Sequence, residues 1–430
     1  MRKLVPFLVF LLTFISVLPV TAQVPGPGGS YTSAFTVQNL EARQGTCQYS
    51  LYEANGTEAY TSTPVTIQAS KSFFVYMGSL SISPASYSAV ISCDVNVAAV
   101  SNYTGSGGAY AASYTGISSV QTATQVSFPG LYKNYYGYYT NVVVQNASSA
   151  SADVTLKIYR GATLVDTETK NVPANASVVF DQKTRAGLTD GIYAGVVEST
   201  GPVAAIVNAW NDAGQQYAYN GFTSGSAVAY APVLMKNYYG FNTALTVQNI
   251  GDAPVNVTVT YSNGATNTKT IPAKASQLFY TPNETGLPSG WLGAAKIEAS
   301  GGNIVALVNE SDVNNRAASY AAFSRGGKTS NAPIVLRRYY GYSTSVTCQN
   351  LGTTPVDITA TYSNGVTEVR NAPANGMALF YQPNTVGLAD NFNGSAIFTA
   401  DQDIVCVVNE NQVTNPEQKD FLLTYEGIVQ

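Results

Sequence analysis

The 430-residue sequence contains no histidine. This absence excludes Ser-His-Asp and Cys-His nucleophile arrangements, histidine general bases, and zinc or iron held by histidine. Charged residues are scarce as well, at 11% of the chain against about 25% in a typical soluble domain. The net charge of −4 and the lack of a basic run argue against nucleic acid as a partner. The surface must therefore be built mainly from uncharged residues, among which the 30 tyrosines stand out.

Long hydrophobic runs are also missing, apart from one at the start of the sequence. Arg2 and Lys3 precede an apolar stretch from Leu4 to Val20, and Val20-Thr21-Ala22 has the small residues of a secretory cleavage site. We therefore expect residues 1–22 to be a signal peptide and the mature chain to be secreted without a membrane span. A retained membrane anchor is the alternative, but a run of about 17 residues is at the short limit for spanning a bilayer.

Three short motifs recur about every 100 residues, and such repetition indicates tandem structural units. The first motif is a Gln-Asn pair after a Val/Leu/Thr-rich stretch, and successive pairs are 107, 103 and 101 residues apart. The pairs are Gln38-Asn39, Gln145-Asn146, Gln248-Asn249 and Gln349-Asn350.

The second motif is an x-Pro-Ala triplet followed by a phenylalanine, and the third is an apolar pair followed by an asparagine. The phenylalanines are Phe180, Phe279 and Phe380, with Val75 in the first repeat, and the asparagines are Asn208, Asn309 and Asn409. Together the motifs predict four units, at residues 23–120, 121–228, 229–330 and 331–430.

Within each unit, apolar and polar residues alternate with a period of two, as in half-buried β-strands. The stretch from Val255 to Tyr261 is an example, and Asn263-Gly264 and Asn364-Gly365 are typical hairpin turns. No segment shows convincing helical periodicity. Seven or eight short strands in about 100 residues are typical of an antiparallel β-sandwich. We expect an all-β chain of four tandem immunoglobulin-like antiparallel β-sandwich domains after the signal peptide.

The stretch from Val247 to Val259 has the pattern strand, Asn-x-Gly, strand, which recurs at Val346 to Tyr362 and more loosely at Val142 to Tyr159. It resembles the opening of immunoglobulin-like modules in secreted bacterial adhesion proteins of the CARDB type. The resemblance covers the core of the repeat and implies tandem extracellular modules on a cell surface or in a secreted polymer. It implies no catalytic residues.

The four cysteines lie in the first and last repeats, and in an exported chain they predict disulfides. Of the three pairings that four cysteines allow, we expect Cys47–Cys93 and Cys348–Cys406, because each closes within one repeat. Pairing across repeats would require the two ends of the chain to meet.

A tyrosine-rich tetrad precedes three of the four Gln-Asn pairs. Its copies are Tyr135-Tyr136-Gly137-Tyr138, Tyr238-Tyr239-Gly240-Phe241 and Tyr339-Tyr340-Gly341-Tyr342. The first repeat has Gly28 and Gly29 in place of the paired tyrosines. Because the tetrad occurs only in units with an N-terminal neighbour, we expect its rings to pack at domain junctions. Stacking on sugar rings and surface display are the alternatives.

The first repeat also lacks the apolar strand that precedes the tetrad elsewhere. Its sheet should therefore have an open edge, which is a template for another strand. We hypothesise that a second chain fills this edge and that the protein polymerises head to tail by strand addition.

No set of catalytic residues stands out. Glu310 and Glu410 recur at one repeat position, but nothing marks the second acid that a glycosidase needs at a set separation. The loops at residues 208–212, 309–315 and 409–415 are rich in Asn and Asp, whose oxygens suit Ca²⁺. Their spacing matches no calcium-loop signature, and Asn-rich turns are common in β-proteins. We therefore expect no cofactor, with calcium as the alternative to turn chemistry.

These observations predict a secreted, extracellular protein of the cell surface that is not an enzyme. Its role would be structural or adhesive, as a component of a surface layer, stalk or filament. Its partners would be further copies of itself or other cell-surface components. The alternative is a carbohydrate-binding array that uses the tyrosine tetrads to bind glycans.

Overall fold

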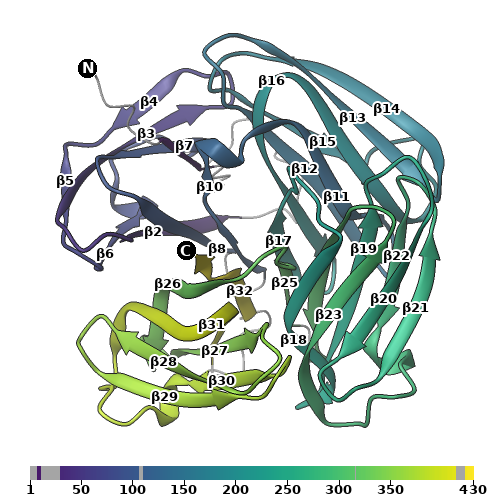
Figure 1. The fold of residues 1–430 in the computed structure, drawn as a ribbon. Helices are drawn as coiled ribbons and strands as arrows, with labels where there is room; N and C mark the ends of the chain where they lie inside the picture. The colour runs from purple at the N-terminus through teal and green to yellow at the C-terminus, as the bar shows by residue number, and fades with distance from the viewer. Residues whose placement is uncertain (1–6, 11–29, 106–109, 315, 413–421) are drawn as a thin grey trace. The chain divides into compact units, whose positions relative to one another are not determined.

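The computed structural model describes residues 7–10, 30–105, 110–314, 316–412 and 422–430 (Figure 1). Over these residues the chain consists of antiparallel β-strands with a few single 3-10 turns, which confirms the predicted all-β class. The structure forms two compact units, Met1–Thr223 and Ser224–Gln430, and each unit holds two repeats. The described part of the chain has no helix of the length and apolarity needed to cross a membrane.

The first unit contains β1 to β17. In the first repeat the elements are β1 (Phe7–Phe10), β2 (Tyr31–Asn39), β3 (Gly45–Glu53), β4 (Glu58–Thr61), β5 (Val65–Ile67), β6 (Ser72–Tyr76), η1 (Met77–Ser79), β7 (Tyr87–Cys93), β8 (Val97–Gly105), β9 (Ala111–Thr115), β10 (Ile117–Ser118) and η3 (Ser119–Gln121). In the second repeat they are β11 (Ala123–Lys133), β12 (Tyr138–Asn146), β13 (Ala152–Arg160), β14 (Thr163–Val172), β15 (Ser177–Asp181), β16 (Gly191–Asn211) and β17 (Gln216–Asn220).

The second unit contains β18 to β33. In the third repeat the elements are β18 (Val228–Tyr238), β19 (Phe241–Asn249), β20 (Val255–Tyr261), β21 (Thr266–Ile271), β22 (Ser276–Tyr280), η4 (Thr281–Asn283), β23 (Trp291–Ser300), β24 (Ile304–Ser311) and β25 (Ala317–Ala321). In the fourth they are β26 (Gly327–Arg337), β27 (Tyr342–Asn350), β28 (Val356–Tyr362), β29 (Thr367–Ala372), β30 (Met377–Tyr381), η5 (Gln382–Asn384), β31 (Phe392–Gln412), β32 (Leu422–Glu426) and β33 (Ile428–Val429).

Each repeat has two antiparallel layers, and the second repeat shows how they are joined. The N-terminal half of the long strand β16 pairs with β11 and β13, whereas its C-terminal half pairs with β12 and β17. The strand β31 does the same in the fourth repeat. In the third repeat, two shorter strands, β23 and β24, take the two roles.

The side chains at the repeated apolar positions form the cores of these sandwiches. Phe180, Phe279 and Phe380 are fully buried, and Val75 at the first-repeat position is buried as well. Strands of the two layers alternate buried and partly exposed residues, for example over Val255–Tyr261, as the period-two pattern predicts. Burial of these apolar surfaces supplies most of the driving force for folding.

The asparagine of each Gln-Asn pair forms what we call the Asn bridge. It is fully buried in all four repeats, as Asn39, Asn146, Asn249 and Asn350. In the third repeat, Nδ2 of Asn249 donates to the carbonyl oxygens of Ala253, Ile271 and Pro272 at 2.7, 3.1 and 3.1 Å. Its Oδ1 accepts a hydrogen bond from the backbone N–H of Gly251 at 2.9 Å.

The Asn bridge explains why the first two sequence motifs occur together. The Nδ2 of Asn146 reaches the carbonyls of Val172 and Pro173, and that of Asn350 reaches those of Ala372 and Pro373. One amide thus joins the end of one strand, the turn after it and the x-Pro-Ala segment. A buried amide that satisfies one buried and two partly buried carbonyls is worth more than an exposed hydrogen bond.

The structure contains the disulfides Cys47–Cys93 and Cys348–Cys406. In both pairs the two cysteines lie directly opposite one another on neighbouring strands, β3 with β7 and β27 with β31. They close loops with sequence separations of 46 and 58 residues. By closing a loop of this length, each disulfide lowers the conformational entropy of the unfolded chain. The folded state is thereby stabilised by roughly 4 kcal/mol for each bond.

The expected gap at the start of the first repeat is filled in the structure. Strand β1 pairs with β7 on one side and with β10 on the other. In the fourth repeat, β26 lies in the same way between β31 and β33. In the whole chain, part of the predicted signal peptide thus forms the opening strand, and the open edge stays a prediction for residues 23–120 alone.

A buried tyrosine holds the opening strand of each later repeat. The hydroxyls of Tyr219, Tyr320 and Tyr425 donate to the carbonyl oxygens of Gly130, Val233 and Ile334, respectively. Each acceptor lies in a β-bulge directly after a proline. Proline has no backbone N–H, and a bulge is a position where the strand ladder does not require that hydrogen bond. Tyr114 lies at the same place in the first repeat, opposite Ser101, and is buried.

We expect Asn249→Ala to destabilise the protein by about 2 kcal/mol, because it leaves one buried carbonyl, two partly buried carbonyls and one partly buried N–H without their partner. Urea unfolding followed by tyrosine and tryptophan fluorescence measures this loss as a lower midpoint. Asn283→Ala is the matched control, since Asn283 is exposed in the same repeat. A loss below about 0.5 kcal/mol for Asn249→Ala would contradict the importance of the Asn bridge.

Candidate functional site: three tyrosine hairpin tips

The tyrosine tetrads form the hairpin turns that connect each opening strand to the next strand. In the first copy the N–H of Tyr135 donates to the carbonyl of Tyr138, and the N–H of Tyr138 donates back to the carbonyl of Tyr135, both at 3.0 Å. Tyr136 and Gly137 both have positive φ, 50° and 81°. A two-residue loop with this geometry is a type I′ turn, whose twist matches that of the flanking strands.

The second tyrosine of each tetrad is held in an unfavourable backbone conformation. We call Tyr136, Tyr239 and Tyr340 the tip tyrosines; their φ angles are 50°, 48° and 47°. A type I′ turn prefers Asn or Gly at this position, and the left-handed region costs other residues about 1–2 kcal/mol. Asn263-Gly264 and Asn364-Gly365 form turns of another kind, in which only the glycine has a positive φ.

Burial does not offset the free-energy cost of this backbone conformation in the tip tyrosines. They are 85%, 83% and 81% exposed, and no other described aromatic side chain is more than 57% exposed. Each packs edge to face against the tyrosine before it, with ring centroids 4.7–4.8 Å apart. Beside the second tip, Val313 is also highly exposed and lies 3.8 Å from the position of a Cβ on Gly240.

The other aromatic residues of the tetrads are structural. The first tyrosines, Tyr135, Tyr238 and Tyr339, are half-buried. The residues at the fourth position are Tyr138, Phe241 and Tyr342, which are half-buried or buried. The hydroxyl of Tyr138 donates to Oε1 of Gln215 at 2.7 Å, and the ring of Phe241 lies 4.7 Å below the guanidinium of Arg316. The fourth position therefore anchors the hairpin to the loop that follows the third motif.

The expectation that the tetrads pack at domain junctions fails for the tip tyrosines. Tyr136 and Tyr340 each belong to the second repeat of a unit, yet both are more than 80% exposed. The physical reason is that a type I′ turn projects its central side chains away from the hairpin. In each of the three later repeats the tetrad forms the turn that follows the opening strand. The corresponding residues of the first repeat, Gly28 and Gly29, lie outside the described residues.

The third motif is one source of the contacts between repeats within a unit, beside contacts such as those of Asn220 with Thr115 and of the Ala321 N–H with Glu426. In the first unit, the hydroxyl of Tyr103 donates to Oδ1 of Asn208 at 2.5 Å. In the second unit, Nδ2 of Asn409 donates to Oε2 of Glu310 at 2.9 Å. Tyr103 and Glu310 occupy equivalent positions of their repeats, so the same geometry joins both pairs. Sequence reasoning missed this role, although the recurring asparagine was its signal.

The junction in the second unit contains a buried carboxyl group. Glu310 is fully buried, and desolvation raises its pKa to about 8, although the hydrogen bond from Asn409 acts in the opposite direction. The neutral acid is therefore favoured in the folded protein at neutral pH. Glu410, the equivalent residue of the last repeat, is also buried.

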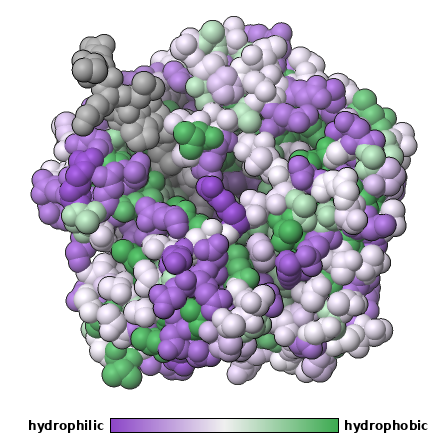
Figure 2. Space-filling model, in the orientation of Figure 1, coloured by the Kyte–Doolittle hydropathy of each residue, from purple (hydrophilic) through white to green (hydrophobic). Residues whose placement is uncertain are grey.

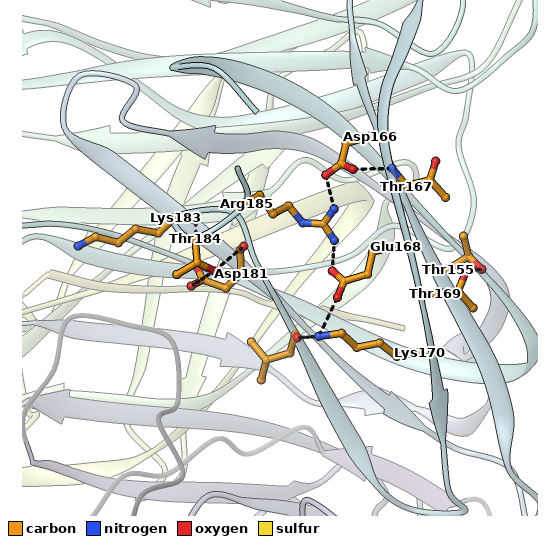
Figure 3. Close-up of polar contacts among 11 residues, drawn as sticks. Thr155, Asp166, Thr167, Glu168, Thr169, Lys170, Asp181, Lys183, Thr184 and Arg185 are labelled. Atoms are coloured by element: carbon orange, nitrogen blue, oxygen red, sulfur yellow. Dashed lines mark hydrogen bonds and ion pairs between the residues drawn. The ribbon is translucent and has the colours of Figure 1, made fainter. Parts of the chain in front are cut away.

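A cluster of charged residues joins β14 to the loop before β16 in the second repeat. The guanidinium of Arg185 makes ion pairs with Asp166 and Glu168, and Lys170 Nζ lies 3.2 Å from Glu168 (Figure 3). Lys170 also donates to the carbonyl of Val179 at 2.7 Å. Both acids are thus paired with cations, so the cluster is suited to holding the loop in place and lacks a free general base.

The Asn- and Asp-rich loops show turn chemistry in the described residues. Oδ1 of Asn211 accepts from the N–H groups of Ala213 and Gln215, and Asp312 makes the same kind of contacts with Asn314 and Arg316. No group of three or more Asp, Glu or Cys side chains suited to a metal gathers among the residues that the structure describes.

The face in Figure 2 carries hydrophobic residues in small, separate groups among pale and hydrophilic ones. Such a surface matches the low content of charge in the sequence, since uncharged polar residues cover most of it. Isolated apolar side chains on a surface need no special explanation. The tip tyrosines do need an explanation, because they are repeated, exposed and held in an unfavourable backbone conformation.

No protein-family model matches the chain, and neither does any curated protein. Among solved structures, the chain is similar to the tetra-tandem repeat in the extending region of a large adhesion protein, at 15% identity and a TM-score of 0.13, over 95% of this chain and 96% of that chain. It is also similar to Thermotoga maritima 1070, at 13% identity and a TM-score of 0.22, over 24% of this chain and 95% of that chain. Scores of this size do not establish a shared arrangement.

The buried Glu310 predicts that the junction in the second unit weakens at high pH. Because its folded pKa is raised above the ordinary value of 4.5, its contribution to stability is complete below about pH 4.5 and is lost as the pH rises to about 8. Glu310→Gln should therefore unfold like the wild type at pH 4.5 and resist unfolding better at pH 8.5.

Thermal unfolding of both proteins at the two pH values measures the difference. Glu298→Gln is the control, because Glu298 is half-buried in the same repeat and pairs with Lys296. A difference between wild type and Glu310→Gln that does not change with pH would contradict the buried, neutral carboxyl.

Proposed function

We propose that this protein is an extracellular, non-catalytic adhesive repeat protein whose sandwiches present the tip tyrosines to a partner surface. The observation that carries the proposal is the combination of exposure above 80% with a left-handed backbone at all three positions. A strained and unburied residue that recurs three times is best explained by a function outside the fold.

Tyrosine is well suited to such contacts. Its rigid ring offers a large contact area at a low cost in side-chain entropy, and its hydroxyl adds a hydrogen bond. Tyrosine is accordingly among the residues that dominate binding interfaces. Three separate tips on one chain would bind a repetitive surface by multivalency, so that weak individual contacts add to a strong attachment.

The rest of the chain supports a mechanical role in a surface layer, stalk or filament. Disulfides close the first and last repeats, and the Asn bridge is present in every repeat. Disulfides are typical of proteins in oxidising, extracellular compartments. The signal peptide predicted at residues 1–22 agrees with export.

A glycan is a second candidate for the partner. In each tip the edge-to-face ring pair has an interplanar angle of 74–79°, so the exposed ring uses its edge or one face for its neighbour and leaves a face open. Such a face can stack on a sugar ring. Binding to a glycan array would distinguish this partner from a protein surface.

We expect the triple variant Tyr136→Asn, Tyr239→Asn, Tyr340→Asn to lose at least tenfold in adhesion to the target surface. Its folding stability should stay the same or rise by about 1 kcal/mol for each site, because Asn is favoured in a type I′ turn. Adhesion of the purified protein to cells or glycan arrays, together with urea unfolding, measures both effects.

The matched control is the triple variant at Tyr76, Tyr280 and Tyr381, each changed to Asn. These tyrosines occupy equivalent strand ends and are 43%, 37% and 38% exposed. The control should keep its adhesion. Undiminished adhesion of the tip variant, or an equal loss in the control, would contradict the proposed function.

A further inference from the structure

The position of β1, between β7 and β10 of the first repeat, is a site that can accept a β-strand. Leu8 lies opposite Ile91 of β7 and Ser118 of β10, and Val9 lies opposite Val90 and Ile117. In the fourth repeat, Ser330 and Asn331 of the opening strand have their partners on β31 and β33 in the same way. We call the space between β7 and β10 the acceptor slot.

The acceptor slot needs an occupant for two physical reasons. Without an opening strand, β7 and β10 would each leave a row of backbone N–H and C=O groups without partners. In the later repeats the opening strand also supplies fully buried core residues, such as Leu131, Leu234 and Val335. A sandwich that lacks this strand lacks both a set of hydrogen bonds and part of its core.

The present occupant belongs to the segment that export is predicted to remove. Phe7–Phe10 lies within residues 1–22, upstream of the predicted cleavage site after Ala22. The sequence that follows, from Gln23 to Gly29, holds two prolines and three glycines, which form strands poorly. The processed chain therefore has no apolar segment of its own next to the slot.

Among the residues that the structure describes, the C-terminal strand of a second copy is already paired within its own repeat. Strand β33 at the C-terminal end pairs with β26 of its own repeat, and its place corresponds to β10 rather than to β1. Residues 413–421 have the sequence Val-Thr-Asn-Pro-Glu-Gln-Lys-Asp-Phe, which is polar and contains a proline. Exchange between identical copies would thus have to break a sandwich that is already complete.

We propose that the acceptor slot of the exported protein binds an apolar β-strand from a different polypeptide. The donor strand runs antiparallel to β7, is uncharged, and resembles Phe-Leu-Val-Phe in chemistry. Recognition occurs by strand addition, in which backbone hydrogen bonds supply affinity and side-chain pockets supply specificity. Tyr114 has the position of the tyrosines that bind the bulge of the opening strand elsewhere.

This inference rests on the export that the proposed function requires, and it gives the adhesive array a fixed attachment point. A partner that inserts a strand into the first repeat would fix that end of the chain. The tip tyrosines, which lie in the other three repeats, would stay available for adhesion.

The test uses the full chain secreted by a bacterial host, whose N-terminus is read by intact mass. A fluorescent peptide of residues 7–12 with added terminal lysines is titrated into the exported protein and followed by polarisation. We expect removal of the leader, saturable binding and a higher unfolding temperature in the presence of peptide. The same peptide with N-methylated backbone amides should not bind, because it cannot form the strand ladder.

Two variants of the exported protein make the test specific. Tyr114→Phe keeps the ring and removes the hydroxyl, and should weaken peptide binding roughly fivefold. Tyr425→Phe removes the equivalent hydroxyl in the fourth repeat, where β26 already fills the slot, and should leave peptide affinity unchanged.

Four results would overturn the inference: retention of residues 7–10 after export, a folded processed protein that does not bind the peptide, equal effects of the two tyrosine variants, or self-association that the peptide competes away. The last would identify a second copy as the donor. Loss of adhesion in the tip variant leaves peptide binding untouched, so a failure of the slot and a failure of the proposed function are distinguishable.

Discussion

The architecture of this protein depends on one buried hydrogen-bonded group, the Asn bridge. In the three later repeats its amide joins the end of a central strand to the turn that follows and to the x-Pro-Ala segment, and in the first repeat it reaches Ile67 and Gln68 at the same place. An apolar residue at this place would leave one buried and two partly buried carbonyls without a partner, which costs more than the loss of an ordinary surface contact. The bridge fixes two loops relative to the core, and the hairpins and junction strands are then held in register.

Because the sandwich is stabilised internally, its surface residues are free to serve other purposes. The tip tyrosines illustrate this freedom, since they occupy a backbone conformation that suits Asn or Gly and are almost fully exposed. The aromatic residues around them anchor the hairpin, so each tetrad divides into a structural part and a part that faces solvent. Figure 2 shows no large hydrophobic area on the visible face that would compete with such small contact points.

The first repeat differs from the others in the origin of its opening strand. In the later repeats a two-residue turn links this strand to the next, and a buried tyrosine binds its bulge. In the first repeat the strand comes from a segment with the features of an export signal. The opening strand of the first repeat therefore has a different origin along the chain, although it pairs with β7 and β10 as β26 pairs with β31 and β33.

The sequence by itself determined the strand class and the cysteine pairs that lie opposite each other, because these depend on local periodicity and on spacing along the chain. It also excluded histidine chemistry outright. It could not show that the asparagine after Gln248 reaches Ile271, or that Tyr136 points to solvent while Tyr138 binds Gln215. Those assignments depend on which strands lie side by side and on the sign of φ in a turn. Only the tertiary structure decides them, since long-range pairing brings together residues that no sequence window contains.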